Sequence, residues 1–210
     1  MNWFSRHFQK RSAAVDSTAT KDGANVRKAI HIDRQFSEAF RDNDIEAVSR
    51  IIKIKPKLLK NRITGGDLLY QACQRNSAEM IKYLMSMGFS VHSRSKLYGV
   101  STLTTAARHG RYDIVKFLID EGVTLDTETA LQNPLFAAVY SGNLSIVSLV
   151  LDQGFDPLIA YTSDTMTNMN AIGFGFWNFE DDAAELIIDY VSQGDPSIAN
   201  KLRSEAKKTF

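Results

Sequence analysis

The chain has 210 residues, of which 44% are hydrophobic, and its 25 basic and 24 acidic side chains leave a formal net charge of +1. This length suits one large domain or two small ones, and the ordinary hydrophobic content excludes a chain that is disordered throughout. The single cysteine, Cys73, excludes a disulfide framework and a cysteine-based zinc site, and no apolar run reaches the roughly 18 residues of a membrane span.

Residues 1–30 are expected to form a tail or capping segment apart from the main domain. Trp3, Phe4 and Phe8 fall at helical spacing among basic residues, and a stretch rich in Ser, Ala, Thr and Gly follows over 12–25. Four roles stay open for this segment: a cap over the first unit, a disordered tail, a membrane-surface anchor and a partner-binding helix. Because its start lacks the apolar core of a secretory signal and the lone cysteine fits a reducing compartment, we expect a cytoplasmic protein.

Repeated helical units follow and form the main predicted domain, residues 31–196. Each unit has a small turn residue between two helical stretches, and these residues are Asn43, Asn76, Gly110 and Gly142. Three units end in a second small residue, and these are Gly88, Gly122 and Gly154. Gly and Asn best tolerate the left-handed backbone with which a helix stops and reverses, so the pattern predicts helix-turn-helix units.

Preferred N-cap residues stand where the first helix of a unit is expected to begin. They are Asp67, Ser101, Asn133 and Asn170. Pro134 follows Asn133 at the first helical position, which proline favours. Each unit is therefore predicted to contain a cap, a short helix, a left-handed turn, a second helix and a left-handed stop.

These units resemble ankyrin repeats. The family pattern, Gly-x-Thr-Pro-Leu-His-x-Ala-Ala-x-x-Gly followed by an apolar second helix, is matched best by residues 99–122. The first unit is degenerate, and a long connection precedes the fifth. The resemblance implies an all-α solenoid of stacked helix-turn-helix units with short or absent β-hairpin tips. The expected units, numbered 1 to 5, are about 34–61, 62–94, 96–126, 128–158 and 166–195, and a basic capping helix is expected over 197–210.

No unit keeps the histidine of the family's Thr-Pro-Leu-His box. Its place is taken by Tyr70, Thr104, Phe136 and Gly173. In the family this histidine hydrogen-bonds to neighbouring turns, so those bonds must be replaced or missing here. We therefore expect an irregular stack that is less stable than a consensus array.

No catalytic site, metal site or cofactor is expected. The four histidines follow no metal-ligand spacing, Cys73 stands at a small-residue position typical of a buried thiol, and residues 173–177 lack the lysine of a phosphate loop. The acidic run over 180–182 suits a helix N-terminus better than a calcium loop. The sequence therefore favours a non-enzymatic protein.

The resemblance implies protein binding through the concave surface, at the turn tips and at the exposed end of each first helix. The partner-binding residues expected on this ground are Arg41, Gln74, Arg75, Tyr98, Val100, Arg108, His109, Gln132, Tyr140 and Trp177. Arg, Tyr and Trp are enriched in interface hot spots. Two alternatives stay open: these are ordinary solvated helix ends, and Trp177 packs against the C-terminal helix.

The net charge hides a separation along the chain. Residues 1–111 carry 20 basic and 9 acidic side chains, residues 112–196 carry one and 14, and residues 197–210 carry four and one. In a solenoid, order along the chain becomes order along the stack, so we expect an acidic half that attracts a basic partner. Its expected members include Asp113, Asp120, Glu121 and Asp126. The alternative is that these carboxylates only solubilise exposed helices.

Three function classes stay open. The leading one is a monomeric protein that binds and occludes another protein, and an immunity protein against a basic bacterial toxin, similar to known inhibitors that resemble ankyrin stacks, is one form of it. The second is a peripheral membrane adaptor anchored by residues 1–11, and the third is an enzyme. No nucleic-acid partner is expected, because the net charge is close to zero.

Overall fold

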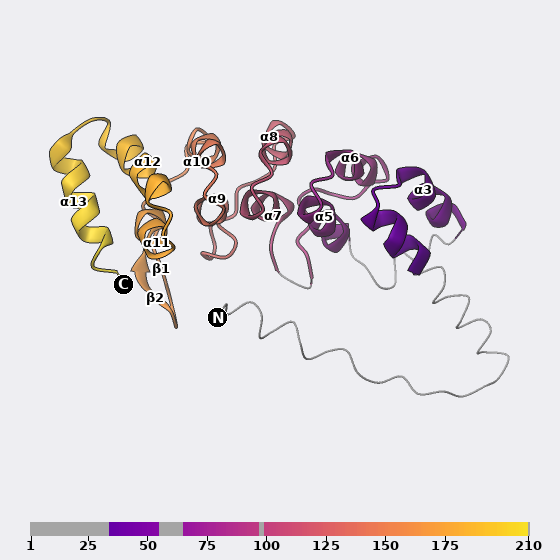
Figure 1. The fold of residues 1–210 in the computed structure, drawn as a ribbon, viewed down its shortest axis with the longest axis horizontal. Helices are drawn as coiled ribbons and strands as arrows, with labels where there is room; N and C mark the ends of the chain where they lie inside the picture. The colour runs from indigo at the N-terminus through magenta and orange to yellow at the C-terminus, as the bar shows by residue number, and fades with distance from the viewer. Residues whose placement is uncertain (1–33, 55–64, 97–98, 210) are drawn as a thin grey trace.

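The computed structural model describes residues 34–54, 65–96 and 99–209. Within these ranges, helix pairs stand side by side along one direction, from the indigo first unit to the yellow C-terminal helix (Figure 1). The predicted all-α solenoid is confirmed. The expectations for residues 1–30, including the anchor over 1–11, lie outside the described residues, and so does Tyr98.

The first helices of the units form one layer and the second helices form another (Figure 1). The first layer contains residues 34–41, α5 (Gly65–Gln74), α7 (Thr102–Arg108), α9 (Pro134–Tyr140) and α11 (Ala171–Trp177). The second layer contains α3 (Ile45–Ile54), α6 (Ala78–Ser86), α8 (Tyr112–Asp120), α10 (Leu144–Leu151) and α12 (Asp181–Ser192). The last helix is α13 (Pro196–Ala206). In the long connection before α11, β1 (Tyr161–Ser163) pairs antiparallel with β2 (Met166–Met169).

Left-handed residues join the helices where the sequence predicts them. The φ angle lies between 57° and 66° at all four predicted turn residues and is positive at all three predicted terminal glycines. These conformations let each chain segment reverse after one helix, which keeps the two layers in contact. In unit 5 the equivalent residue is Phe179, with a φ of 63°, and the repeat pattern does not predict it.

Three of the four predicted N-caps are confirmed. The side chains of Ser101, Asn133 and Asn170 accept hydrogen bonds from backbone N–H groups in the first turns of α7, α9 and α11. The prediction for Asp67 is wrong, because α5 begins two residues earlier. Asp67 is buried in the first turn of that helix, and its carboxylate accepts a hydrogen bond from the Ser95 hydroxyl of the next connection.

The core is one continuous apolar layer between the two helix layers. First helices contribute small residues that allow close approach, among them Ala72, Ala106, Ala107 and Ala138. Second helices contribute large side chains that are fully buried, among them Leu84, Leu118, Leu151 and Ile187. Burial of each large side chain contributes about 1.5–3 kcal/mol, so helix packing rather than local propensity holds these short helices.

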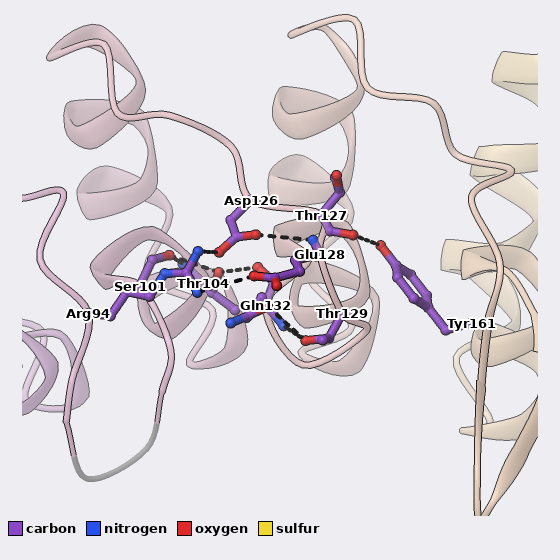
Figure 2. A network of polar contacts seen from close by, with 9 residues as sticks. All are labelled: Arg94, Ser101, Thr104, Asp126, Thr127, Glu128, Thr129, Gln132 and Tyr161. Atoms are coloured by element: carbon purple, nitrogen blue, oxygen red, sulfur yellow. Dashed lines mark hydrogen bonds and ion pairs between the residues drawn. The ribbon is translucent and has the colours of Figure 1, made fainter.

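Other side chains replace the missing box histidines. Thr104 Oγ1 donates a hydrogen bond to the Gln132 carbonyl at 2.7 Å, and so ties unit 3 to unit 4. The Tyr161 hydroxyl donates to the Thr127 carbonyl at 2.7 Å and accepts from Asn133 Nδ2 at 3.0 Å. Figure 2 shows Thr104 and Tyr161 reaching the connection between units 3 and 4 from opposite sides. At these positions the expected loss is therefore compensated.

The last helix, α13, contacts both α11 and α12 and buries Ala199, Leu202 and Ala206. Arg203 of this helix forms a two-pronged ion pair with Glu185 of α12, with Nη2–Oε2 at 2.6 Å and Nε–Oε1 at 2.9 Å. The hydrogen bond from Arg203 lowers the pKa of Glu185 below its ordinary value. The ion pair therefore fixes α13 over the end of the stack.

Glu185→Gln is expected to lower stability at pH 7 by about 0.5–1 kcal/mol, a small value because both side chains are about one-third exposed. Since the folded-state pKa of Glu185 is lowered, its contribution is complete above the unfolded pKa of about 4.3 and is lost as the pH falls through the folded pKa. Thermal melts of the variant and the wild type should therefore differ at pH 7 and converge near pH 2.5. Glu205→Gln, at an exposed pair with Lys201, is the matched control. A difference that persists at pH 2.5 would contradict the assignment.

Candidate partner-binding surface

Equivalent side chains of the first helices form a row along the stack. Two positions before each left-handed turn residue stand Arg41, Gln74, Arg108, Tyr140 and Trp177, which we call the first-helix row. Each is exposed or half-buried. The row changes from polar and basic in units 1 to 3 to aromatic in units 4 and 5. Five separate helices therefore present one continuous series of side chains.

The middle of the row is held by contacts between units. The guanidinium carbon of Arg108 lies 5.1 Å from the ring centroid of Tyr140 in the next unit. Burial lowers the pKa of Arg108, while the hydroxyls of Tyr140 and Tyr70 act in the opposite direction. Gln74 Nε2 donates to the Tyr70 hydroxyl at 3.2 Å. Arg108 is therefore a cation held on an aromatic face, and a partner would meet it already oriented.

Trp177 ends the row in unit 5. Its side chain is 41% exposed, and its ring lies 5.9 Å from that of Phe174 on the preceding turn of α11. Phe176 of the same helix contacts the residue that ends α13, with its ring centroid 5.9 Å from Lys207 Nζ. Trp177 therefore packs on its own helix with one part of its surface and leaves the rest open to a partner.

Hydrogen bonds connect the turns of successive units and set the spacing of the row. The Ser77 hydroxyl donates to the side-chain oxygen of Asn43. Arg111 Nη2 donates to the Gln74 carbonyl at 3.0 Å, and Asn143 makes an equivalent bond of 3.5 Å to the turn of unit 3. The turns of units 2, 3 and 4 are thereby each tied to the turn before them. The first-helix row is thus carried by a rigid edge rather than by independent loops.

His109 and Arg75, two further residues expected to bind a partner, each follow a residue of the row. Arg75 is exposed, and His109 is half-buried with its Nε2 atom unpartnered among the described residues. Burial, with the nearby charges of Arg111 and Arg108, lowers the pKa of His109 below its usual value. The imidazole is therefore neutral at pH 7, and its unpartnered Nε2 atom is buried rather than presented to a partner.

One of the two predicted tip contacts that the structure describes has to be revised. The prediction that Val100 contacts a partner is wrong, because only 6% of this residue is exposed. The Ser95 N–H donates to the Val100 carbonyl at 3.0 Å, and this bond folds the connection back so that Val100 points inward. Gln132 is half-buried, and its carbonyl already accepts the hydrogen bond from Thr104.

The predicted acidic half is weakened by ion pairs. Asp126 is paired with Arg94, whose Nη1 also lies 3.7 Å from a Glu128 oxygen (Figure 2). Asp120 lies 3.2 Å from Lys116 Nζ on the same helix. The ion pair with Arg94 therefore offsets the charge that Asp126 adds to the expected acidic half.

The remaining predicted acidic residues lie away from the row. Asp113 is in the first turn of α8, Asp120 ends that helix, and Glu121 caps it. All three are exposed on the second layer, whereas the row belongs to the first. The acidic surface and the row are therefore separate features of the stack.

The described residues provide no metal-ligating cluster, membrane-spanning helix or reactive cysteine. They hold no group of three or more His, Cys, Asp or Glu side chains able to bind a metal ion, and no helix among them is long and apolar enough to cross a bilayer. Cys73 is fully buried, and burial raises the pKa of its thiol to about 12. This thiol stays protonated at neutral pH and does not act as a nucleophile.

Comparisons with known proteins agree with this architecture. A family model described as ankyrin repeats (3 copies) matches residues 36–129 and 89–160. A putative ankyrin repeat protein of Rickettsia felis is 28% identical over 106 residues, which make up 49% of this chain and 47% of that protein. The palmitoyltransferase ZDHHC13 of Homo sapiens is 36% identical over 93 residues, 43% of this chain and 15% of that enzyme.

The matched stretches cover less than half of these relatives, so the similarity transfers no enzymatic activity to this chain. Ankyrin repeats generally mediate protein–protein interaction and are generally non-catalytic, in keeping with a surface that offers contacts rather than reactive groups. The family model spans more than half of the chain and coincides with the stacked helix pairs and their left-handed turns. The chain belongs to the ankyrin-repeat family.

Proposed function

We propose that this protein binds a partner protein along the first-helix row and thereby covers part of the partner's surface. The observation that carries the proposal is the contact of Arg108 with Tyr140, in a part of the row whose turns, in units 1 to 4, are joined by hydrogen bonds. Arg, Tyr and Trp are the residue types that most often dominate binding energy in interfaces. Because these side chains are already held in place, binding costs little conformational entropy.

Three finer statements about the role, the location and the unbound state of the protein go beyond this proposal. An immunity role against a basic toxin, a cytoplasmic location and a monomeric unbound state stay predictions from the sequence. The adaptor alternative depends on residues 1–11, outside the described residues. Rescue of toxin-expressing cells tests the first role, and liposome co-sedimentation with and without residues 1–11 tests the adaptor role.

The proposal is tested by affinity capture from the native host, followed by binding measurements on the identified protein. Arg108→Ala and Tyr140→Ala should each weaken binding at least about tenfold, as expected for hot-spot residues. Tyr112→Ala is the matched control, because it removes a partly exposed tyrosine from the second layer. Thermal melts confirm that each variant is folded. Equal binding by all three variants would overturn the proposal.

A further inference from the structure

Phe179 is a large aromatic side chain that does not contribute to the apolar core. It is 92% exposed, although it stands at the turn position that Asn or Gly occupies in the other four units. A left-handed backbone costs an ordinary residue about 1–2 kcal/mol, and a side chain that stays in water recovers nothing through burial. Folding alone therefore favours Asn or Gly here. No described residue covers this side chain, which leaves it available for a binding contact.

Trp177 provides a second exposed aromatic surface at the same turn. It is the last residue of α11, two positions before Phe179, and Phe174 supports its ring from the preceding turn. We call Trp177 and Phe179 the aromatic tip. The tip continues the first-helix row from Tyr140 around the end of α11, toward the start of the second layer.

Three carboxylates follow the aromatic tip directly. Glu180 caps α12, and Asp181 and Asp182 occupy its first turn. None of the three forms an ion pair with any residue that the structure describes, whereas Glu185, one turn further on, is held by Arg203. Two exposed aromatic residues are thus followed in the chain by three carboxylates that have no ion-pair partner among the described residues, and Asp181 and Asp182 are exposed.

We infer that the aromatic tip and the carboxylates of residues 180–182 bind a basic, arginine-bearing segment of the partner protein. An arginine side chain stacks on an exposed aromatic ring while its guanidinium donates hydrogen bonds to a neighbouring carboxylate. The inference rests on the proposed function, and it adds which end of the row the basic segment of the partner occupies. The basic side chains Arg41, Arg75 and Arg108 repel such a segment, so it lies at the unit 5 end of the row.

A peptide probe tests the site without knowledge of the partner. Nona-arginine is titrated into the full-length Trp3→Phe variant, in which Trp177 is the remaining one of two tryptophans and reports by fluorescence. We expect saturable binding at the tip and none with nona-glutamate. Phe179→Asn should weaken binding about fivefold to tenfold. Asn43 and Asn76 show that asparagine adopts this backbone, so the variant should remain as stable as the parent.

Charge variants distinguish binding at the aromatic tip from attraction of the peptide to acidic residues elsewhere on the protein. The double variant Asp181→Asn/Asp182→Asn should weaken peptide binding about tenfold at low salt. Glu121→Gln/Asp152→Asn removes the same charge from exposed caps at the far ends of α8 and α10, and it should change binding less than twofold. Equal weakening by the two charge variants, with no effect of Phe179→Asn, would overturn the inference. Absence of saturable nona-arginine binding would overturn it as well.

The same variants distinguish this inference from the proposed function. Once the partner is purified, the two assignments can be separated. Loss of binding in Tyr140→Ala but not in Phe179→Asn would contradict the role of the aromatic tip and would still support the first-helix row. Loss in both variants supports both assignments. Unchanged binding in both removes the proposed function together with the site that depends on it.

Discussion

Phe136→Ala is expected to destabilise the protein by about 3–5 kcal/mol and to divide its unfolding into two transitions. Phe136 takes the place of the box histidine and is 3% exposed. Its ring centroid lies 5.2 Å from that of Tyr161 in the hairpin and 5.1 Å from that of Phe174 in unit 5. Phe136 thus joins unit 4 both to the hairpin and to unit 5. Because stability in a repeat stack depends on contacts between neighbours, its loss should uncouple unit 5 from the rest.

Urea unfolding in the Trp3→Phe background measures both effects. Far-UV circular dichroism follows the whole stack, and Trp177 fluorescence follows unit 5. The two curves should coincide in the parent protein, whereas in Phe136→Ala the fluorescence transition should move to lower urea. Phe136→Leu is the control, since it keeps most of the apolar volume and should cost less than about 1.5 kcal/mol. Coincident transitions in Phe136→Ala would show that this residue does not couple the units.

The solenoid could be predicted from sequence because turn residues report backbone conformation directly. Asn43, Asn76, Gly110 and Gly142 all have a positive φ, which Gly and Asn tolerate best. Phe179 adopts the same conformation without any intrinsic preference for it. In the sequence it follows Phe174, Phe176 and Trp177, so it is indistinguishable from a core aromatic residue. The packing of α11 on α12 fixes its backbone, and only the folded structure reveals its exposure.

The exposure of the proposed binding residues could be predicted only where helix position determines it. Arg108, Tyr140 and Trp177 stand two residues before a turn, and all three reach the surface. Contacts between segments far apart in the chain decide the other cases. Val100 is buried because its connection folds back on itself, and Asp126 loses its free charge to an arginine of the preceding unit. Such pairings leave no local pattern in a sequence.

The turn that carries the aromatic tip depends on a close approach of two helices at Gly175. A Cβ atom added there would lie 2.9 Å from Ala184 Cβ, 3.3 Å from Ala184 Cα and 3.2 Å from the Glu180 carbonyl oxygen. In an exposed helix, Gly→Ala stabilises by about 1 kcal/mol. Here the added methyl group meets the backbone of α12, so Gly175→Ala should instead destabilise by about 2 kcal/mol, in the range of overpacked cores. A loss of stability in Gly175→Ala, in place of the gain expected in an exposed helix, is the result that identifies the close contact.

Two further variants locate the cause of that loss. Gly173→Ala places its methyl group 2.7 Å from Thr209 Oγ1, an atom near the chain end that can rotate away, so its stability should change by less than about 0.5 kcal/mol. Ala184→Gly removes the atom nearest to the new methyl group, and the double variant Gly175→Ala/Ala184→Gly should recover at least about 1 kcal/mol relative to the sum of the single changes. Urea denaturation of the wild type, Gly175→Ala, Ala184→Gly and the double variant measures this coupling. If Gly175→Ala is stabilising, or if the two changes add, α11 and α12 are not in the close contact that aims Phe179 at the solvent.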